Sequence, residues 1–176
     1  MEALEIRYSF AEDGKVLKQW LEDEKNWPFF PVSSKAEAAV FAENWIGFAK
    51  YKAALSVLLN EEVVGLGVLF LMPYKKVAHS ASLYFIVEEA KRKRGLGFAL
   101  LKNLINLAKN YFHLETLVVE LARDSAAFSL IEKFGFKQFA FQENYFKSEH
   151  QTSPRWLFEL FLNQIELSKL SSSGGL

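Results

Sequence analysis

The chain has 176 residues, of which 51% are hydrophobic and 15% aromatic, so it is long enough to bury a substantial core as a single globular domain. Basic and acidic residues number 21 each, and the formal net charge of +0 argues against nucleic acid or an acidic membrane as a partner. The absence of cysteine excludes disulfides, thiolate metal sites and a cysteine nucleophile. The start of the chain lacks the features of a signal peptide and no apolar run approaches the ~18 residues of a membrane span, so a cytoplasmic location is expected.

The first fifty residues predict a strand, two helices and a loop between the helices. A strand is expected over 4–10, and a turn at Asp13-Gly14 leads into a helix around 16–21. Residues 26–31, Asn-Trp-Pro-Phe-Phe-Pro, contain two prolines, which exclude helix and central strand and predict an aromatic-rich loop. Ser34-x-x-Glu37 has the spacing of a capping box, which predicts that a helix over 35–50 begins there.

The remaining chain predicts strands that alternate with amphipathic helices. The segments expected as strands are 53–59, 63–72, 77–87, 117–121, 139–141 and 156–162, the last two paired with each other across a turn that contains Pro154. Leucine spacing predicts a helix over 96–112, and a second helix is expected to begin at Asp124 and end at Gly135. This order predicts one mixed α/β domain over 1–165 with a central sheet, followed by a flexible tail over 166–176.

A glycine-bearing turn separates the apolar run 83–87 from the helix that begins after Gly95. A strand, such a turn and a helix together present several backbone N–H groups to one phosphate, and a side chain at a glycine position would hold the ligand away. The cationic segment 92–94 lies where the anion would bind. Leu100 occupies the third-glycine position of a dinucleotide turn and no Gly-Lys-Ser/Thr follows, so neither of those nucleotide motifs fits.

The pattern Arg92-x-x-Gly95-x-Gly97 resembles the acyl-CoA motif of the GCN5-related N-acetyltransferase (GNAT) superfamily. Read alone, the same residues also fit a basic, solvated start of a helix. A second signature of the family, a strand followed by Asn-x-x-Ala-x-x-Leu-Tyr-x-x-x-Gly-Phe, is matched at its alanine, leucine, glycine and phenylalanine by Ala127, Leu130, Gly135 and Phe136. The segment 142–146 is similar in spacing to the Asn-Tyr-Tyr segment of ribosomal-protein and peptide N-terminal acetyltransferases.

The resemblance implies an acetyl-CoA-dependent N-acetyltransferase with a mixed, mostly antiparallel sheet of about six or seven strands and about four helices. In the family, the turn amides bind the CoA pyrophosphate and the end of the preceding strand pairs with the pantetheine arm. The residues it places at the cofactor are Phe85, Ile86, Val87, Arg92, Lys93, Arg94, Gly95, Leu96, Gly97, Phe98, Ala99, Asp124, Ala127 and Phe128. No metal is expected, because the three histidines lack metal-ligand spacing.

The first helices of a GNAT fold and the loop that joins them cover the acyl-acceptor site. The residues that this implies at the acceptor are Trp27, Phe29, Phe30, Tyr84 and Asn144. For the three aromatic residues of the loop, packing into the core is the alternative explanation.

The sequence departs from the family at the groups that carry protons. The position of the thiolate-protonating tyrosine holds Ile131, and the asparagine of the second signature is replaced by Asp124. The base of the peptide N-terminal relatives falls at Val119, whereas Glu120, one step along, is expected on the other face of the strand. A second common base position falls at Ala81.

Glu120, Tyr84 and Tyr145 therefore remain candidates for the proton-carrying groups, and Tyr145 is the favoured proton donor. The acceptor that the motifs favour is a protein N-terminus; a small amine such as a polyamine or an antibiotic, or a catalytically silent acyl-CoA-binding module, are the alternatives. An α-amine with a pKa near ~8 is partly neutral at pH 7, whereas a lysine amine near ~10.4 needs far more assistance. The sequence fits a monomer or a homodimer equally.

Overall fold

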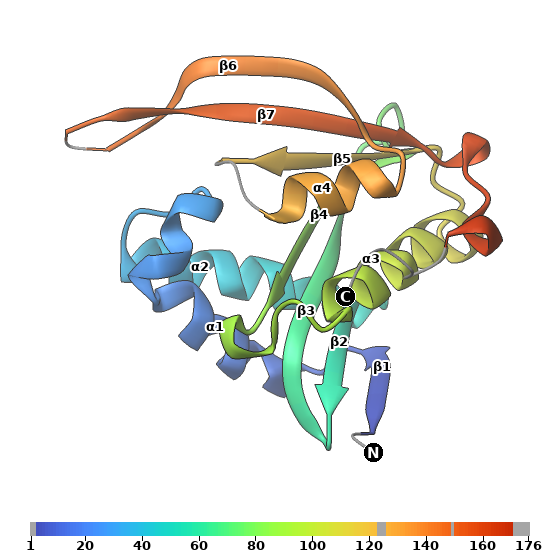
Figure 1. Ribbon diagram of the computed structural model, residues 1–176, viewed down its shortest axis with the longest axis horizontal. Helices are drawn as coiled ribbons and strands as arrows, with labels where there is room; N and C mark the ends of the chain where they lie inside the picture. The colour runs from blue at the N-terminus through green and yellow to red at the C-terminus, as the bar shows by residue number, and fades with distance from the viewer. Residues whose placement is uncertain (1–2, 123–125, 149, 171–176) are drawn as a thin grey trace.

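The computed structural model describes residues 3–122, 126–148 and 150–170, and within them the chain forms a seven-stranded sheet in the order β1-β2-β3-β4-β5-β7-β6 with helices on both faces (Figure 1). The strands are β1 (Leu4–Tyr8), β2 (Ala54–Leu59), β3 (Glu62–Leu71), β4 (Ser80–Val87), β5 (Thr116–Leu121), β6 (Lys137–Lys147) and β7 (Thr152–Phe161). The α-helices of these described segments are α1 (Gly14–Glu22), α2 (Lys35–Ile46), α3 (Leu96–Asn106) and α4 (Ala126–Lys133). The predicted mixed α/β fold is confirmed.

The sheet opens between β4 and β5. These strands are parallel and pair only over Ser80–Ser82 and Thr116–Val118, whereas every other neighbouring pair in the described sheet is antiparallel. Beyond Ser82 and Val118 the described pairing stops, so the carboxyl-terminal halves of the two strands diverge. Figure 1 shows β5 running across the direction of β4.

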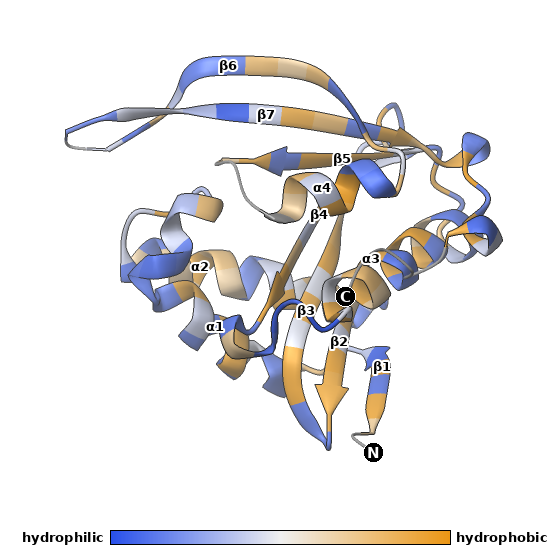
Figure 2. Cartoon of the chain, in the orientation of Figure 1, coloured by the Kyte–Doolittle hydropathy of each residue, from blue (hydrophilic) through white to orange (hydrophobic). Residues whose placement is uncertain are grey.

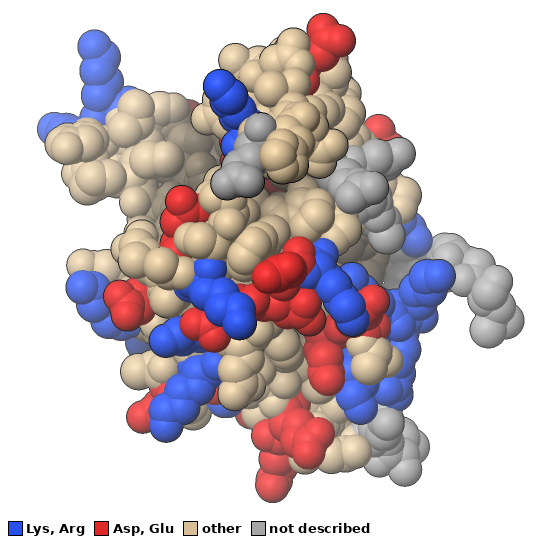
Figure 3. Space-filling view, turned by 90° about the vertical axis from the view of Figure 1, so that its left-hand side faces the viewer, with Lys and Arg blue, Asp and Glu red and all other residues tan. Residues whose placement is uncertain are grey.

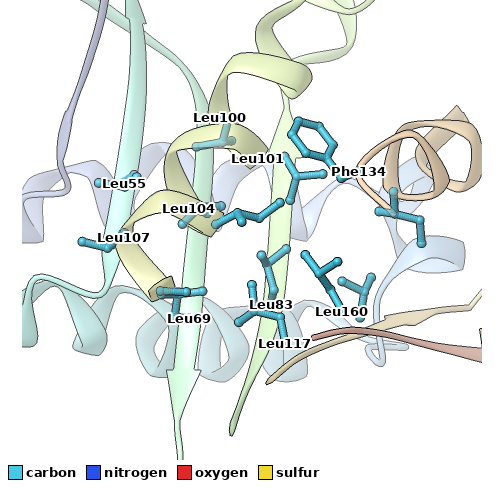
Figure 4. Packing of buried hydrophobic residues seen from close by; sticks show 14 of the residues in the cluster. Leu55, Leu69, Leu83, Leu100, Leu101, Leu104, Leu107, Leu117, Phe134 and Leu160 are labelled. Carbon is cyan, nitrogen blue, oxygen red and sulfur yellow. The ribbon is translucent and has the colours of Figure 1, made fainter. Parts of the chain in front are cut away.

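Two hydrophobic cores hold the sheet from its two faces. Leu100, Leu101 and Leu104 of α3 are fully buried and pack with leucines of the sheet and Phe134 of the α4 segment (Figure 4). α3 crosses β3 at Gly67, where an added Cβ would lie 2.4 Å from Leu104 Cδ1, so any larger residue would force the buried Leu104 side chain to shift. On the other face, α1 and α2 enclose a second core around the fully buried Trp45.

The prediction that the prolines of 26–31 exclude helix is wrong. Glu24–Phe29 form a 3₁₀-helix that contains Pro28. It is held by the hydrogen bonds from Asn26 N to Asp23 O and from Phe30 N to Trp27 O, neither of which needs an N–H from Pro28. Only half of the predicted capping box forms: Ser34 Oγ accepts from Glu37 N, but the Glu37 carboxylate accepts from Ser33 N at 2.7 Å.

The last two strands are much longer than predicted and form a hairpin that extends past the end of β5 (Figure 1). Pro154, expected in the turn, lies within β7. Its missing N–H is tolerated because the pairing of β7 with β5 ends at Trp156, and the register between β6 and β7 shifts at this point. Beyond β7, Lys109 Nζ donates to Ile165 O and Lys102 Nζ donates to Leu170 O, which places residues 165–170 against the α3 segment.

Candidate active site

A cavity of about 550 Å³ occupies the gap where β4 and β5 diverge. Its walls come from β4, the turn before α3, the end of β5, α4 and the 3₁₀-helix Glu24–Phe29. The described lining residues are Asn26, Phe29, Phe30, Leu83, Tyr84, Phe85, Ile86, Val87, Arg92, Lys93, Gly95, Gly97, Phe98, Val119, Glu120, Leu121, Ala122, Ala127 and Leu130.

The backbone of β4 presents unpaired groups to this cavity. Glu88 N donates to Val64 O at 2.9 Å, so the even-numbered residues of this segment bond to β3. Because antiparallel pairing alternates, the N–H and C=O groups of Phe85 and the N–H of Val87 point to the opposite side, where β5 has separated, and Val87 O on that side accepts from Arg92 Nε. An extended ligand with amide groups can therefore pair with this edge of β4.

The glycine turn forms one end of the cavity. Gly95 has φ +79°, in the left-handed region, and is the N-cap residue of α3; no side chain caps the first amides of this helix. Arg92 and Lys93 line the same end, and Figure 2 shows the turn as a hydrophilic segment between the apolar β4 and α3. Free amides at a helix N-terminus beside two cations are suited to a phosphate group.

Arg92 also links this turn to the first helices. Its Nε donates to Val87 O at 3.0 Å and its Nη2 lies 3.4 Å from Asn26 Oδ1. Asn26 is fixed in turn by a hydrogen bond of 2.7 Å from its Nδ2 to Trp20 O. The guanidinium therefore joins the end of β4 to the segment that carries Phe29 and Phe30.

The other end of the cavity holds a carboxylate. Glu120 Oε1 lies 3.4 Å from the hydroxyl of Tyr84, which donates to it across the gap between the strands. Burial, together with the nearby Glu120 charge, raises the pKa of Tyr84 far above its ordinary value of 10.0. Tyr84 is therefore a neutral hydrogen-bond donor at physiological pH.

Arg155 binds the second oxygen of this carboxylate and was missed in the sequence. Its Nη1 lies 2.9 Å from Glu120 Oε2, its Nε donates to Gln142 Oε1 at 2.8 Å, and its guanidinium stacks 3.5 Å from the ring centroid of Tyr145. β5 and β7 place Glu120 opposite Leu157, so Arg155 is its diagonal neighbour on the same face. The sequence Ser-Pro-Arg-Trp contains no signal for this pairing.

Comparison with protein families decides the class of this site. Residues 6–152 match the family model described as "Acetyltransferase (GNAT) domain". The chain belongs to the GNAT acetyltransferase family. Acetyl-CoA is the acetyl donor of GNAT acetyltransferases, and the cavity offers the uncapped helix start and the open strand edge that such a ligand requires.

Solved structures of GNAT proteins share the fold at low sequence identity. A GNAT-family acetyltransferase from Streptococcus pneumoniae has 22% identity and a TM-score of 0.74, with 90% of this chain and 99% of that chain covered. A putative acetyltransferase from Salmonella typhimurium, solved with its cofactor acetyl-CoA, has 15% identity and a TM-score of 0.74 over 93% and 96%. A ribosomal-protein-alanine N-acetyltransferase from Brucella melitensis has 18% identity and a TM-score of 0.73 over 89% and 99%. No curated protein sequence matches the chain.

Most of the residues that the sequence placed at the cofactor meet at the cavity. The lining includes Phe85, Ile86, Val87, Arg92, Lys93, Gly95, Gly97, Phe98 and Ala127, but Arg94, Leu96, Ala99 and Phe128 are not among its described residues. Leu96 is buried, and Phe128 packs edge-on against Trp156 and Phe158. Asp124 lies outside the described residues.

The residues expected at the acceptor divide into two groups. Phe29, Phe30 and Tyr84 line the cavity, and all three also pack in the α1–α2 core, which was the alternative explanation for the two phenylalanines. Trp27 packs against the same core, donates from its indole Nε1 to Leu21 O at 3.0 Å and is not part of the described lining. In the hairpin, Asn144 Oδ1 accepts from Thr152 Oγ1 at 2.7 Å, and the side chain of Tyr145 is 46% exposed; neither belongs to the described lining.

The positions of the family's usual proton carriers lie in the hydrophobic core. Val119, Ala81 and Ile131 are each at most 2% exposed and belong to the cluster beneath α3. Glu120 and Val119 project from opposite faces of β5, as the alternation of side chains along a strand predicted. Glu120 lies on the same face of the sheet as Tyr84 of β4, to which it is hydrogen-bonded. The described carboxylate of the cavity is therefore Glu120.

The described residues contain neither a membrane-spanning helix nor a cluster of metal ligands. No helix among residues 3–122, 126–148 and 150–170 is long and apolar enough to cross a membrane. The same part of the chain contains no group of three or more His, Cys, Asp or Glu side chains that could hold a metal ion. On the face shown in Figure 3, cationic and anionic side chains are interspersed.

Proposed function

We propose that this GNAT protein transfers the acetyl group of acetyl-CoA to the α-amine of a protein N-terminus. The observation that carries the proposal is the distribution of charge along one cavity. Arg92 and Lys93 line the end at the glycine turn, while Glu120 is the one carboxylate among the described lining residues. The donor's phosphates and an ammonium-bearing acceptor are thereby drawn to different parts of the same space.

The distance between these parts suits a reaction between two extended ligands. Tyr84, which contacts Glu120, and Val87, which contacts Arg92, are three residues apart on β4, or about 10 Å along a strand. The open N–H and C=O groups of β4 lie between them. A backbone N–H of this edge would polarise the acetyl carbonyl, as a positioned donor does in acyl transfer.

Acetyl transfer to an amine requires a neutral nucleophile and a destination for its proton. As the C–N bond forms and the C–S bond of the thioester breaks, CoA leaves as a thiolate that can take a proton from solvent, and we assign Glu120 as the group that accepts the proton from the amine, through direct contact or one water molecule. The neutral hydroxyl of Tyr84 donates to Glu120 and holds its carboxylate in the cavity. Tyr145 is a weaker candidate than the sequence indicated, because its ring lies beneath Arg155 and outside the described lining.

The pairing of Glu120 with Arg155 favours an acceptor that is already partly neutral. At pH 7 an α-amine of pKa near 8 is neutral in roughly 10% of molecules, compared with about 0.04% for a lysine amine near 10.4. The neutral fractions of the two amines thus differ by about 200-fold. Glu120 is the one carboxylate described in the cavity and one of its oxygens is bound by Arg155, so its capacity to remove a proton from a charged amine is limited. An α-amine is therefore the acceptor that this site suits best.

Matched acceptors test the proposal. Peptides of one sequence would carry either a free α-amine and no lysine, or a blocked N-terminus and one lysine, with a polyamine as third acceptor and CoA release as the readout. We expect kcat/KM at pH 7 to be at least tenfold higher for the free α-amine, by the neutral fractions above. Equal or faster turnover of the lysine peptide or the polyamine would contradict the assignment. If the protein binds acetyl-CoA but releases no CoA in the presence of any amine, it is a catalytically silent binding module. The apolar Ile131 at the family's tyrosine position favours this alternative.

A further inference from the structure

We infer that Arg155 is the positioning residue that sets the orientation of the Glu120 carboxylate for acetyl transfer. The inference rests on the proposed function, because it concerns the same carboxylate, but it assigns a role to a residue of the β6–β7 hairpin outside the described cavity lining. Arg155 does not line the cavity and acts through Glu120.

Arg155 lies where the hairpin leaves the rest of the sheet. It precedes Trp156, the first residue of β7 in chain order that pairs with β5. It follows Pro154, opposite the shift in register between β6 and β7. Before Trp156 the hairpin has no described pairing with β5, and the side chain of Arg155 supplies a connection between the two.

The side-chain contacts of Arg155, which lies on β7, come from two other strands. Glu120 lies on β5, whereas Gln142 and Tyr145 lie on β6. The Gln142 amide oxygen accepts from both Nε and Nη2 of Arg155, and the Tyr145 ring covers the guanidinium face. A guanidinium fixed on two sides has little freedom when it meets the carboxylate, so it determines the direction of that carboxylate.

Both oxygens of Glu120 are engaged by this arrangement. Oε2 accepts from Arg155 at 2.9 Å and Oε1 from Tyr84 at 3.4 Å, and the two charged side chains are only 19% and 15% exposed. A pair buried to this extent gives little net stability compared with apolar packing, because both ions lose water. The orientation that it imposes on the carboxylate beside the cavity explains the pair better than stability does.

Five variants separate a positioning role from a structural one. In Arg155→Gln, we expect kcat for the α-amine peptide to fall by about tenfold to a hundredfold, because small displacements of a reacting group have effects of that size. The KM for acetyl-CoA should stay within about twofold, since the glycine turn is untouched. Arg155→Lys keeps the charge but cannot span Glu120 and Gln142, so an intermediate kcat is expected.

The double variant gives the sharpest readout. If Arg155 acts only through Glu120, the kcat of Glu120→Gln/Arg155→Gln will lie within about twofold of that of Glu120→Gln alone. This variant leaves no unpaired charge, so it also remains informative if Arg155→Gln fails to fold. Lys147→Gln is the matched control, because it removes an exposed cation at the end of β6 in the same hairpin. This variant should retain the kcat of the parent protein.

Two results would overturn the inference while leaving the proposed function intact. They are a kcat for folded Arg155→Gln within twofold of the parent, and losses that multiply in the double variant. If the parent protein binds acetyl-CoA but acetylates no amine, the proposed function fails and the role of Arg155 fails with it.

Discussion

The hydroxyl of Tyr84 lies 3.4 Å from Oε1 of Glu120 and joins β4 to β5 across the gap that forms the cavity. Tyr84 is also part of the aromatic cluster beneath α2, where its ring meets Phe41 edge-on at 5.4 Å between centroids. The rigid core of the protein therefore fixes one side of the carboxylate, and the hairpin fixes the other through Arg155.

Removal of this hydroxyl should affect turnover and leave cofactor binding unchanged. We expect Tyr84→Phe to lower kcat by about threefold to tenfold, the effect of losing a hydrogen bond that contributes about 1 kcal/mol. Burial raises the pKa of Tyr84 well above 10.0, so the hydroxyl stays protonated and the shape of the pH–rate profile should not change. In both proteins kcat/KM should rise with pH until the α-amine is neutral, near ~8. A profile that loses an ionisation in Tyr84→Phe would show that Tyr84 itself exchanges a proton in the reaction.

The glycine turn provides a direct test of the cofactor site. Gly97 lines the cavity, and a Cβ there would lie 3.3 Å from Leu130 Cδ2. In Gly97→Glu we expect acetyl-CoA affinity to fall by at least a hundredfold, equivalent to about 3 kcal/mol, because bulk and negative charge are added where we propose that the phosphates bind. Gly47→Glu is the matched control, since a Cβ at Gly47 meets nothing within 4 Å. Calorimetry on both variants would contradict the location of the site if Gly97→Glu stayed within twofold of the parent.

Substitution of Trp27 should mainly affect stability, whereas substitution of Phe29 should mainly affect recognition of the acceptor. Trp27 is held by its indole hydrogen bond to Leu21 and packs on the α1–α2 core, so Trp27→Ala should lower the free energy of unfolding by about 2 kcal/mol. Phe29 lines the cavity, so Phe29→Ala should raise KM for the peptide several-fold with a smaller loss of stability. Urea unfolding and steady-state kinetics measure both quantities. The reverse assignment of the two effects would show that Trp27 contacts the acceptor.

A buried network far from the cavity predicts a pH dependence of stability. The Asp13 carboxylate accepts from Arg7 at 2.7 and 3.0 Å, from Phe10 N at 2.9 Å and from Ser56 at 2.7 Å. Burial alone would raise the pKa of Asp13, but these hydrogen bonds and the Arg7 charge outweigh it and hold the pKa below 3.8. The stabilisation is therefore present above pH ~4 and is lost as the pH falls through the lowered pKa.

Asp13→Asn should lower the free energy of unfolding at pH 7 by about 2 kcal/mol, because Arg7 loses its partner. The difference from the parent protein should shrink as the pH falls below 4. Glu22→Gln removes an exposed ion pair with Lys18 and should change stability by less than about 0.5 kcal/mol. Urea unfolding at several pH values makes the comparison, and a difference that is independent of pH would contradict the assigned role of Asp13.

The sequence predicted those parts of the fold that depend on local patterns. Strands such as Ala54–Leu59 and the amphipathic α3 follow from hydrophobic periodicity, and the turn around Gly95 follows from glycine and charge. The length of the hairpin could not be predicted in this way. Most residues of β6 are exposed, including Phe139 and Phe141, so its pattern of hydrophobicity lacks the alternation of a half-buried strand.

The sequence predicted those residues of the candidate site that belong to a contiguous motif. Arg92 and Gly97 occur in one motif and both line the cavity. Arg155 could not be found, because its relation to Glu120 exists only through the pairing of β5 with β7, 35 residues apart in sequence. Trp27 and Phe29 are only two positions apart, yet Phe29 lines the cavity and Trp27 does not. The difference depends on the direction of each side chain, which the sequence does not reveal.

The most direct test of the central claim, that the cavity between β4 and β5 holds acetyl-CoA, is a calorimetric titration of the purified protein with acetyl-CoA. We expect one site per chain with micromolar affinity, about −8 kcal/mol. Absence of binding up to millimolar acetyl-CoA would contradict the account, because the protein would then have the fold of an acetyltransferase without its donor site.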